Sequence, residues 1–322
     1  MTSEFSALIT PLMIAPMINW TNNHFRVFMR LLAPRALVYT EMQTYGAIIN
    51  NPARALHFSA CESPIALQLG GANKRELVEC ARRAEDYGFA EINLNLGCPS
   101  RKVQAGKFGA CLMLQPELVA DCIAALKNSV KIPITAKTRI GVDHHDSYEF
   151  FSSFVHKLVA AGCDKLIVHA RKAWLHGLSP KENRTIPPVN YNFVYNIKRE
   201  LPNLCVVING NIRDTLSIEK HRQKVDGVMI GRLTYQNPYA ITAIHQQFYP
   251  ESIVPTRQAI LTQYIEYIRQ QKANNLNLSL LLKPIFNINH GLPNKKYWQT
   301  VLQKTLQEKQ LKYLMVAASM SQ

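Results

Sequence analysis

The amino-acid sequence predicts an α/β fold, a closed (β/α)8 TIM barrel followed by a small all-helical domain. Short apolar runs rich in β-branched residues alternate eight times with helix-period segments in the first 250 residues, which is typical of a parallel sheet. An open doubly wound sheet would need a glycine-rich turn after its first strand, and Met17-Ile18-Asn19 supplies none. From Pro255 onward only helical patterns remain.

The expected elements follow the chain in a regular order. Eight buried strands are predicted at residues 12–17, 37–42, 65–70, 90–96, 134–140, 165–170, 205–210 and 227–231. Helices between them include residues 74–87, 116–129, 148–161, 193–201 and 239–248, and two more are predicted at 257–272 and 296–315. The connections at 97–115 and 171–189 are longer than a barrel needs, so we expect functional loops there.

Charge and composition divide the chain into a barrel domain, residues 1–250, and a helical domain, residues 251–322. The second part holds nine Lys or Arg and three Glu, a net +6 in 72 residues, and the first part holds the other +9. A total of +15 usually indicates a polyanionic partner, either nucleic acid or an anionic membrane. A basic enzyme without such a partner is the alternative.

Other classes of protein are excluded by composition. With 47% hydrophobic and 18% charged residues, the chain is globular rather than disordered, and no apolar run approaches the roughly 18 residues of a membrane span. Residues 1–10 do not resemble a signal peptide, and seven irregularly spaced cysteines favour a reducing cytoplasm. The sequence contains no CxxC or HExxH motif, so we expect no metal. A cytoplasmic monomer is predicted.

Polar residues and glycines follow the predicted strands, where barrel enzymes place their chemistry. The turns at Asn209-Gly210-Asn211 and Gly231-Arg232 would let backbone N–H groups approach a phosphate, and Arg232 could add a bidentate contact. Either glycine alone could equally be an ordinary tight turn. The pair, after strands seven and eight, favours a phosphate site.

Three further strand ends carry Gln68, Lys137 and His169, which could contact a planar heterocycle above the barrel. A lysine beside the pyrimidine edge of a flavin stabilises negative charge on the reduced ring. An inward lysine or histidine with a purely structural role is the alternative.

Cys98 follows Asn95 and Gly97 at the start of the first long connection. A thiol is mostly protonated at neutral pH, which suits proton donation better than nucleophilic attack. The alternative is a small buried apolar residue, the role we expect for Cys80, Cys122, Cys163 and Cys205.

Five motifs resemble those of the tRNA-dihydrouridine synthases: APM at 15–17, NLNLGCPS at 93–100, GKFGACLM at 106–113, KTRIG at 137–141 and NG at 209–210. The stretches HARKAWL at 169–175 and GLSPKENR at 177–184 resemble the bacterial branch that modifies uridines 20 and 20a of the D-loop. The resemblance spans essentially the whole chain.

This resemblance implies a barrel that binds FMN, a helical tRNA-binding domain, and NADPH as reductant. It implies that hydride passes from the reduced flavin to uracil C6, that Cys98 donates the proton to C5, and that Asn95 and Arg139 contact the uracil. It assigns FMN binding to Pro16, Met17, Ile18, Gln68, Lys137, His169, Asn209, Gly210, Asn211, Gly231 and Arg232.

Cations on the second long connection and in the helical domain are expected to contact tRNA: Lys181, Arg184, Lys295 and Lys296. Tyr297 and Trp298 follow the last two lysines and could stack on an unpaired base, or they could be core residues of a helical bundle.

Two other functions remain open. An FMN-dependent barrel acting on a free pyrimidine or an enone would share the site but would not need the +15 charge. A non-catalytic RNA-binding protein would explain the charge, but not Cys98, Lys137 and His169 at strand ends.

Overall fold

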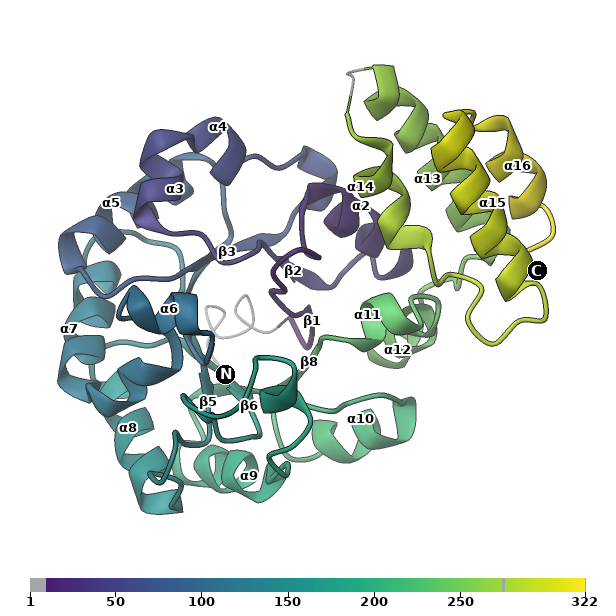
Figure 1. Cartoon of the computed structure of the whole chain (residues 1–322). Helices are drawn as coiled ribbons and strands as arrows, with labels where there is room; N and C mark the ends of the chain where they lie inside the picture. Colours follow the sequence, from purple (N-terminus) through teal and green to yellow (C-terminus); the bar gives the residue numbers. More distant parts are fainter. Residues whose placement is uncertain (1–9, 274–275, 322) are drawn as a thin grey trace.

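The computed structural model describes residues 10–273 and 276–321, and it contains a closed parallel barrel of eight strands. Each strand pairs with the next, and β1 pairs with β8 to close the ring, so the predicted (β/α)8 barrel is confirmed (Figure 1). The strands are β1 (Leu12–Ile14), β2 (Leu37–Tyr39), β3 (Ile65–Leu69), β4 (Glu91–Leu96), β5 (Ile134–Arg139), β6 (Lys165–His169), β7 (Cys205–Asn209) and β8 (Gly227–Ile230).

An outer ring of helices covers the strands. Its members are α2 (Asn23–Leu32), α3 (Tyr45–Asn50), α4 (Pro52–Ala55), α5 (Lys74–Asp86), α7 (Pro116–Lys127), α8 (Tyr148–Ala160), α9 (Tyr191–Glu200), α10 (Thr215–Arg222), α11 (Leu233–Gln236) and α12 (Ala240–Phe248). The five barrel helices predicted from sequence lie within two residues of their expected bounds. Asn22, Asn73 and Ser147 cap three of the helices by accepting backbone N–H groups of the first turn.

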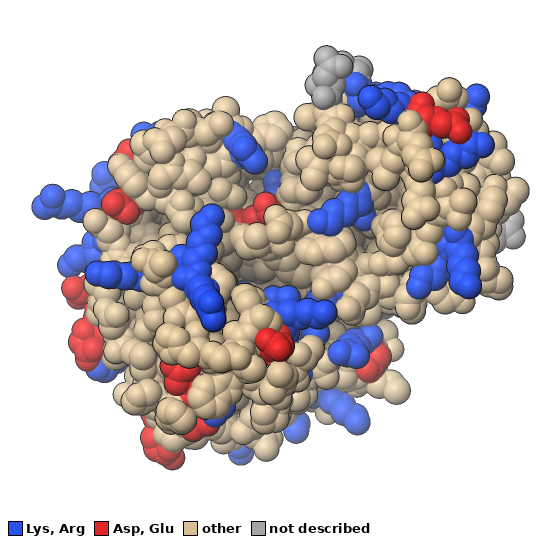
Figure 2. Space-filling view, viewed as in Figure 1, with Lys and Arg blue, Asp and Glu red and all other residues tan. Residues whose placement is uncertain are grey.

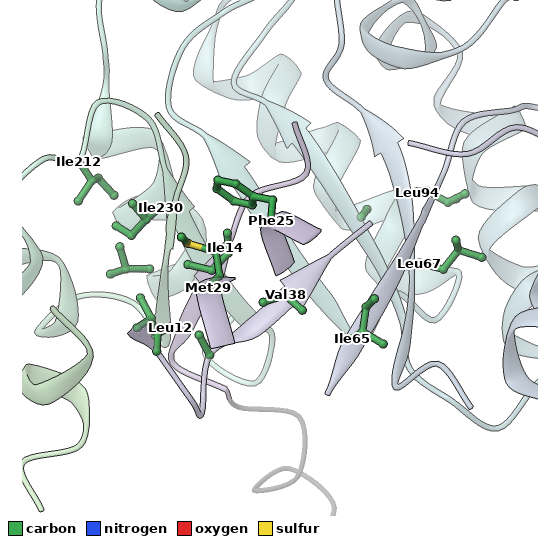
Figure 3. Close-up of a cluster of buried hydrophobic side chains, with 14 of the residues drawn as sticks. Leu12, Ile14, Phe25, Met29, Val38, Ile65, Leu67, Leu94, Ile212 and Ile230 are labelled. Atoms are coloured by element: carbon green, nitrogen blue, oxygen red, sulfur yellow. The ribbon is translucent and has the colours of Figure 1, made fainter. Parts of the chain in front are cut away.

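Strand residues alternate between the two faces of the barrel wall, as a period of two requires. Leu12 and Ile14 belong to the outer core cluster, in which Ile14 lies beside Phe25 and Met29 of α2 (Figure 3). The interior cluster comprises Met13, Ala15, Leu37, Tyr39, Ala66, Ile167, Cys205, Val207 and Met229.

A buried ion pair joins two strands inside the barrel. Lys165 Nζ lies 2.7 Å from Glu91 Oε2, and the hydroxyl of Tyr39 donates to Glu91 Oε1 at 2.7 Å. Both charged residues begin their strands, so the pair lies at the end of the barrel opposite the carboxyl ends of the strands. Loss of either partner would leave an uncompensated buried charge.

The chain continues beyond the barrel as α13 (Arg257–Ala273), α14 (Leu278–Leu282), a 3-10 turn η4 (Lys283–Ile285), α15 (Lys295–Glu308) and α16 (Lys312–Ala318). The single helix predicted at 296–315 is wrong, because Lys309 adopts a left-handed φ of 55° and ends α15. Lys272 Nζ donates to the carbonyl of Lys309 at 2.6 Å and holds this break.

Of these C-terminal elements, α13, α14 and η4 pack against α2 (Figure 1). The ring of His24 on α2 is hydrogen-bonded to the Tyr267 hydroxyl of α13 at 2.7 Å. Lys283 Nζ donates to the carbonyl of Asn19 at 2.7 Å and lies 4.2 Å from the ring centroid of Trp20. Within the described ranges, no helix has both the length and the hydropathy needed to cross a membrane.

Candidate active site

Strand register brings the predicted site residues together at the carboxyl ends of the strands. Asn95 of β4 is paired with Lys137 of β5. Arg139, two residues further along β5, is paired with His169 of β6, which is paired with Asn209 of β7. Since paired residues on neighbouring strands share a face, these five side chains belong to the set that faces the barrel interior. They therefore surround one mouth.

A chain of hydrogen bonds runs down the barrel interior from this mouth. Asn95 Nδ2 donates to Gln68 Oε1 at 2.9 Å, and Gln68 Nε2 donates to Asn93 Oδ1 at 2.8 Å. Asn93 Nδ2 then donates to Thr135 Oγ1 at 2.8 Å, and that hydroxyl donates to Glu91 at 2.6 Å. Each amide donates at nitrogen and accepts at oxygen, so the orientation of Gln68 is fixed and its nitrogen retains one hydrogen for a ligand.

Lys137 places a partly buried amino group at this mouth. Its Nζ donates to Asn209 Oδ1 at 3.2 Å, and Asn209 Nδ2 donates to the carbonyl of Met229 at 2.7 Å. Burial lowers the pKa of Lys137 to about 7, and the guanidinium of Arg139 acts in the same direction. An anion placed against Nζ would raise this pKa again.

His169 stands beside these cations as a neutral ring. Burial lowers its pKa well below the ordinary value, and Arg139 and Lys137 lower it further. A neutral imidazole has one nitrogen that donates and one that accepts. His169 can therefore hydrogen-bond a heterocycle without adding charge.

The turns after β7 and β8 present backbone donors to the same mouth. Gly210 has a φ of 119°, and a Cβ there would lie 2.7 Å from the ring of His169, so glycine is required. Among the described residues, the backbone N–H groups of Gly210, Asn211, Gly231 and Arg232 have no hydrogen-bond acceptor. These four free N–H groups, together with the guanidinium of Arg232, suit the oxygens of a phosphate.

The loop after β1 adds an apolar edge. The carbonyl of Met17 accepts from the N–H groups of Trp20 and Thr21 at 2.9 and 3.0 Å, which closes a tight turn after Pro16. This turn leaves the side chain of Ile18 53% exposed. An exposed apolar side chain at a polar mouth suits contact with the face or edge of a flat ring.

Hydrogen bonds to the backbone N–H and the carbonyl of Cys98 fix the position of this residue. Asn95 Oδ1 accepts from the N–H groups of Gly97 and Cys98 at 3.2 and 3.0 Å, and the carbonyl of Cys98 accepts from Ala110 at 2.9 Å. Cys98 is partly exposed, whereas the four cysteines predicted to be structural, Cys80, Cys122, Cys163 and Cys205, are all buried.

Arg139 contacts two neighbouring loops. Its Nε donates to the carbonyl of Gly97 at 2.8 Å, and its Nη1 donates to the carbonyls of Lys172 and Asn183 at 3.0 Å each. Arg139 is 3% exposed. It ties the loop after β4 to the loop after β6, a role that sequence reasoning did not predict, and its contact with uracil stays a prediction.

Sequence reasoning missed two amides that shape the mouth. Gln104 Nε2 donates to the carbonyl of Pro99 at 2.9 Å and to that of Leu175 at 2.8 Å. Asn183, fully buried, accepts from the N–H of Trp174 at 2.7 Å and donates to its carbonyl at 2.9 Å. An amide in a polar loop carries no periodic signal, so neither could be found from one sequence.

The predicted RNA contacts lie on two parts of the molecule. Lys181 and Arg184 are exposed on the loop after β6, whose carbonyl at Arg184 accepts from Arg232 at 3.2 Å. At the start of α15, Lys296 is exposed and Lys295 is half-buried. Figure 2 shows Lys and Arg side chains both around the hollow at the barrel mouth and over the C-terminal helices.

The two aromatic residues of α15 differ. Trp298 is 1% exposed and its Nε1 donates to the carbonyl of Ile285 at 2.9 Å, so it is a core residue of the helical bundle. Tyr297 is 48% exposed. Only Tyr297 is free to stack on a base.

The sequence profile described as dihydrouridine synthase matches residues 13–321. The chain belongs to the dihydrouridine synthase family. A tRNA-dihydrouridine(20/20a) synthase of Synechocystis sp. is 47% identical over 305 residues, which are 94% of this chain and 91% of the relative. One of the same name from Shewanella oneidensis is 47% identical over 290 residues, 90% of this chain and 87% of the relative.

A solved structure of 2-naphthoyl-CoA reductase with 2-naphthoyl-CoA shares the fold, with a TM-score of 0.57, at 10% identity over 78% of this chain and 53% of that chain. Membership of the dihydrouridine synthase family makes this protein an oxidoreductase with a flavin cofactor and a tRNA substrate. Within the residues that the structure covers, no group of three or more His, Cys, Asp or Glu side chains could hold a metal ion.

Proposed function

We propose that this protein reduces uridine to 5,6-dihydrouridine at positions 20 and 20a of tRNA, with FMN as its flavin and NADPH as the reductant. The observation that carries the proposal is the row of free N–H groups after β7 and β8 beside Lys137, with Cys98 on the same mouth. The donors suit a single phosphate, which favours FMN over FAD. The uridine position rests on the two relatives named for it.

Each residue of the mouth has a role toward the cofactor. Bound FMN supplies the hydride that uracil C6 receives. The N–H groups of Gly210, Asn211, Gly231 and Arg232 would bind its phosphate. Lys137 would place positive charge beside the pyrimidine edge, where it stabilises the reduced form. The other proposed contacts are Pro16, Met17, Ile18, Gln68, His169 and Asn209.

The uracil would lie against the loop after β4. Cys98 would hold the proton at Sγ that C5 receives, and Asn95 and Arg139 would contact the base. A positively charged mouth stabilises the negative charge that develops on the uracil when C6 accepts hydride. The backbone bonds of Asn95 to Cys98 keep the thiol in place before the base arrives.

A uridine inside folded tRNA must leave its stack before it can reach the mouth, so the protein must hold the RNA meanwhile. We assign this contact to Lys181 and Arg184 at the mouth, and to Lys295 and Lys296 on a helical tRNA-binding domain of residues 251–322. A free pyrimidine or an enone as substrate would leave these exposed cations without a partner. We propose that the enzyme acts as a monomer.

The test uses purified protein and tRNA from a strain that lacks the gene. Extracted cofactor should co-migrate with FMN, and incubation with NADPH should place dihydrouridine at positions 20 and 20a, as mapped by mass spectrometry of nuclease fragments. Extracted FAD would contradict the cofactor assignment. Dihydrouridine at other positions, or reduction of free uridine in preference to tRNA, would contradict the substrate assignment.

A further inference from the structure

The connection between β4 and α7 carries three cations that the assignments above leave unused. It contains the short helix α6 (Arg101–Ala105), on which Arg101 and Lys102 are exposed, and Lys107 follows as a third exposed cation. Residues 97–115 include no Asp or Glu. Across the described ranges, none of the three side chains has an ion-pair or hydrogen-bond partner. Three unneutralised charges within seven residues attract an anion.

These cations stand directly beside the proposed proton donor. Helix α6 begins after Ser100, whose hydroxyl accepts from the N–H of Val103, and Ser100 is two residues from Cys98. Figure 1 shows α6 inside the ring of outer helices, across the mouth from α14. In Figure 2 a row of Lys and Arg side chains lies over this position and borders the central hollow.

The backbone that carries the cations is held in one conformation. Lys107 has a left-handed φ of 57°, which costs an L-residue about 1–2 kcal/mol and persists only where neighbouring contacts fix it. Its N–H donates to the carbonyl of Gln104 at 2.8 Å, and Gln104 in turn is bonded to Leu175 of the loop after β6. Binding an anion here therefore needs little ordering of the backbone.

The geometry of an extruded nucleotide explains why a surface is needed at this place. A base that enters the mouth remains attached to its strand, so a phosphate group lies on each side of it. The C-terminal helices stand on one side of the mouth and α6 on the other (Figure 1). A strand that leaves the mouth on the side of α6 passes close to these cations.

We propose that Arg101, Lys102 and Lys107 form a further tRNA contact surface, which binds backbone phosphates on the side of the mouth opposite the C-terminal helices. This inference rests on the proposed function, since only an RNA substrate supplies those backbone phosphates. The α6 cations and the C-terminal helices together hold the strand on both sides of the target uridine.

The test compares two triple variants of the flavin-loaded enzyme. The first, Arg101→Ala/Lys102→Ala/Lys107→Asn, removes the α6 cations, with asparagine chosen because it tolerates left-handed backbone. The control, Arg82→Ala/Lys131→Ala/Lys220→Ala, removes three exposed cations that lie toward the amino ends of the strands, away from the mouth. Both change the net charge of +15 by three positive charges, so bulk charge is matched.

The measurement is the dissociation constant for tRNA across a salt series. The salt slope is the steepness with which the logarithm of the association constant falls with the logarithm of salt concentration, and each lost phosphate contact should lower it by about 0.7. The slope of the α6 variant should therefore be smaller than that of wild type by about 2, and the control should keep the wild-type slope. kcat/KM for tRNA should fall with the affinity. The flavin absorption spectrum and the rate of flavin reduction by NADPH should match wild type in both variants.

Two results would overturn the inference alone. In the first, the salt slope of the α6 variant equals that of wild type. In the second, the salt slope falls equally in the α6 variant and in the control, which would mean that total charge rather than α6 governs binding. Wild-type enzyme that reduces its flavin but neither binds tRNA nor forms dihydrouridine would overturn the proposed function itself, and the α6 surface with it.

Discussion

At the scale of single residues, Lys137 has the environment that most alters its chemistry. An ammonium group normally stays charged far above neutral pH, but burial lowers the pKa of Lys137 to about 7. Lys137 of the flavin-free protein therefore loses its proton near neutral pH, far below the pH at which an ordinary lysine does. A flavin that carries negative charge would favour the protonated form, so cofactor binding should take up a proton.

This linkage predicts that FMN affinity depends on pH. As the pH rises from 7 to 9, Lys137 loses its proton in the flavin-free protein, so the dissociation constant of FMN should increase, by at most about tenfold per pH unit. The measurement is quenching of FMN fluorescence by flavin-free protein. Lys137→Met should bind FMN more weakly at pH 7 and show a flat profile. A variant with the wild-type pH dependence would mean that another group titrates.

The proposed reaction has two halves, reduction of the flavin by NADPH and reduction of the uridine by the flavin. Cys98 should serve only the second. Cys98→Ala should reduce its flavin with NADPH at the wild-type rate and form dihydrouridine about 10²–10⁴-fold more slowly, as expected for a lost general acid. Stopped-flow absorbance of the flavin separates the two steps. Cys111→Ala is the matched control, because Cys111 is a partly exposed thiol on the same connection. Equal damage to both half-reactions would assign Cys98 to cofactor binding instead.

At the scale of elements, the strands are predictable because buried parallel strands are continuous apolar runs between turn residues. Their ends are harder to place. The apolar pattern predicts a first strand that reaches residue 17, but β1 ends at Ile14, because the chain closes a turn at Met17 after Pro16. Helices as short as α4 and α6 escape prediction, since one turn contains no repeat of the helical period.

The candidate site is partly predictable for a related reason. Strand ends share one edge of a barrel, so the amino-acid sequence alone is enough to group Gln68, Lys137, His169 and Asn209. The bonds of Arg139 to two loops depend on contacts between distant parts of the chain, which a single sequence does not encode locally.

Hydrogen bonds join the loops of the mouth to each other. Asp143 of the loop after β5 donates its N–H to the carbonyl of Ala173 at 2.7 Å and accepts from Leu175 at 2.8 Å. Gln104 bonds to the carbonyls of Pro99 and Leu175, which connects the loop of Cys98 to this pair. The three loops therefore hold the thiol as a unit.

Removing this connection should impair the step that we propose Cys98 serves. Gln104→Met loses two neutral hydrogen bonds, each worth about 1 kcal/mol, so dihydrouridine formation should slow by about tenfold or more. The rate of flavin reduction by NADPH should not change, and alkylation of Cys98 by iodoacetamide should change its rate. Gln247→Met, which removes an amide donor to Thr215 on the outer ring, is the control. A slower flavin reduction in Gln104→Met would indicate general damage to the barrel.

At the scale of the whole molecule, the C-terminal helices support the loops that are proposed to hold FMN. Lys283 is bonded to Asn19 after β1 and lies over the ring of Trp20. Trp20 stacks on Tyr235, with ring centroids 4.1 Å apart and planes inclined by 10°. Asn287 donates to the carbonyl of Tyr235 at 2.9 Å, in the segment that follows β8. The bundle thus contacts the segment after the first strand, β1, and the segment after the last strand, β8, which carries part of the proposed phosphate site.

This arrangement predicts that a substitution in the helical bundle alters flavin binding. Lys283→Met keeps most of the side-chain volume but removes the bond to Asn19 and the cation–π contact with Trp20, interactions worth about 1 kcal/mol each before solvent screening. The loop of Pro16, Met17 and Ile18 should then be held less firmly, and FMN should dissociate about threefold to tenfold faster, as measured by fluorescence recovery on dilution. Lys272→Met, which removes a bond to Lys309 inside the bundle, should leave that rate unchanged. If both variants release FMN at the wild-type rate, the bundle does not support the cofactor.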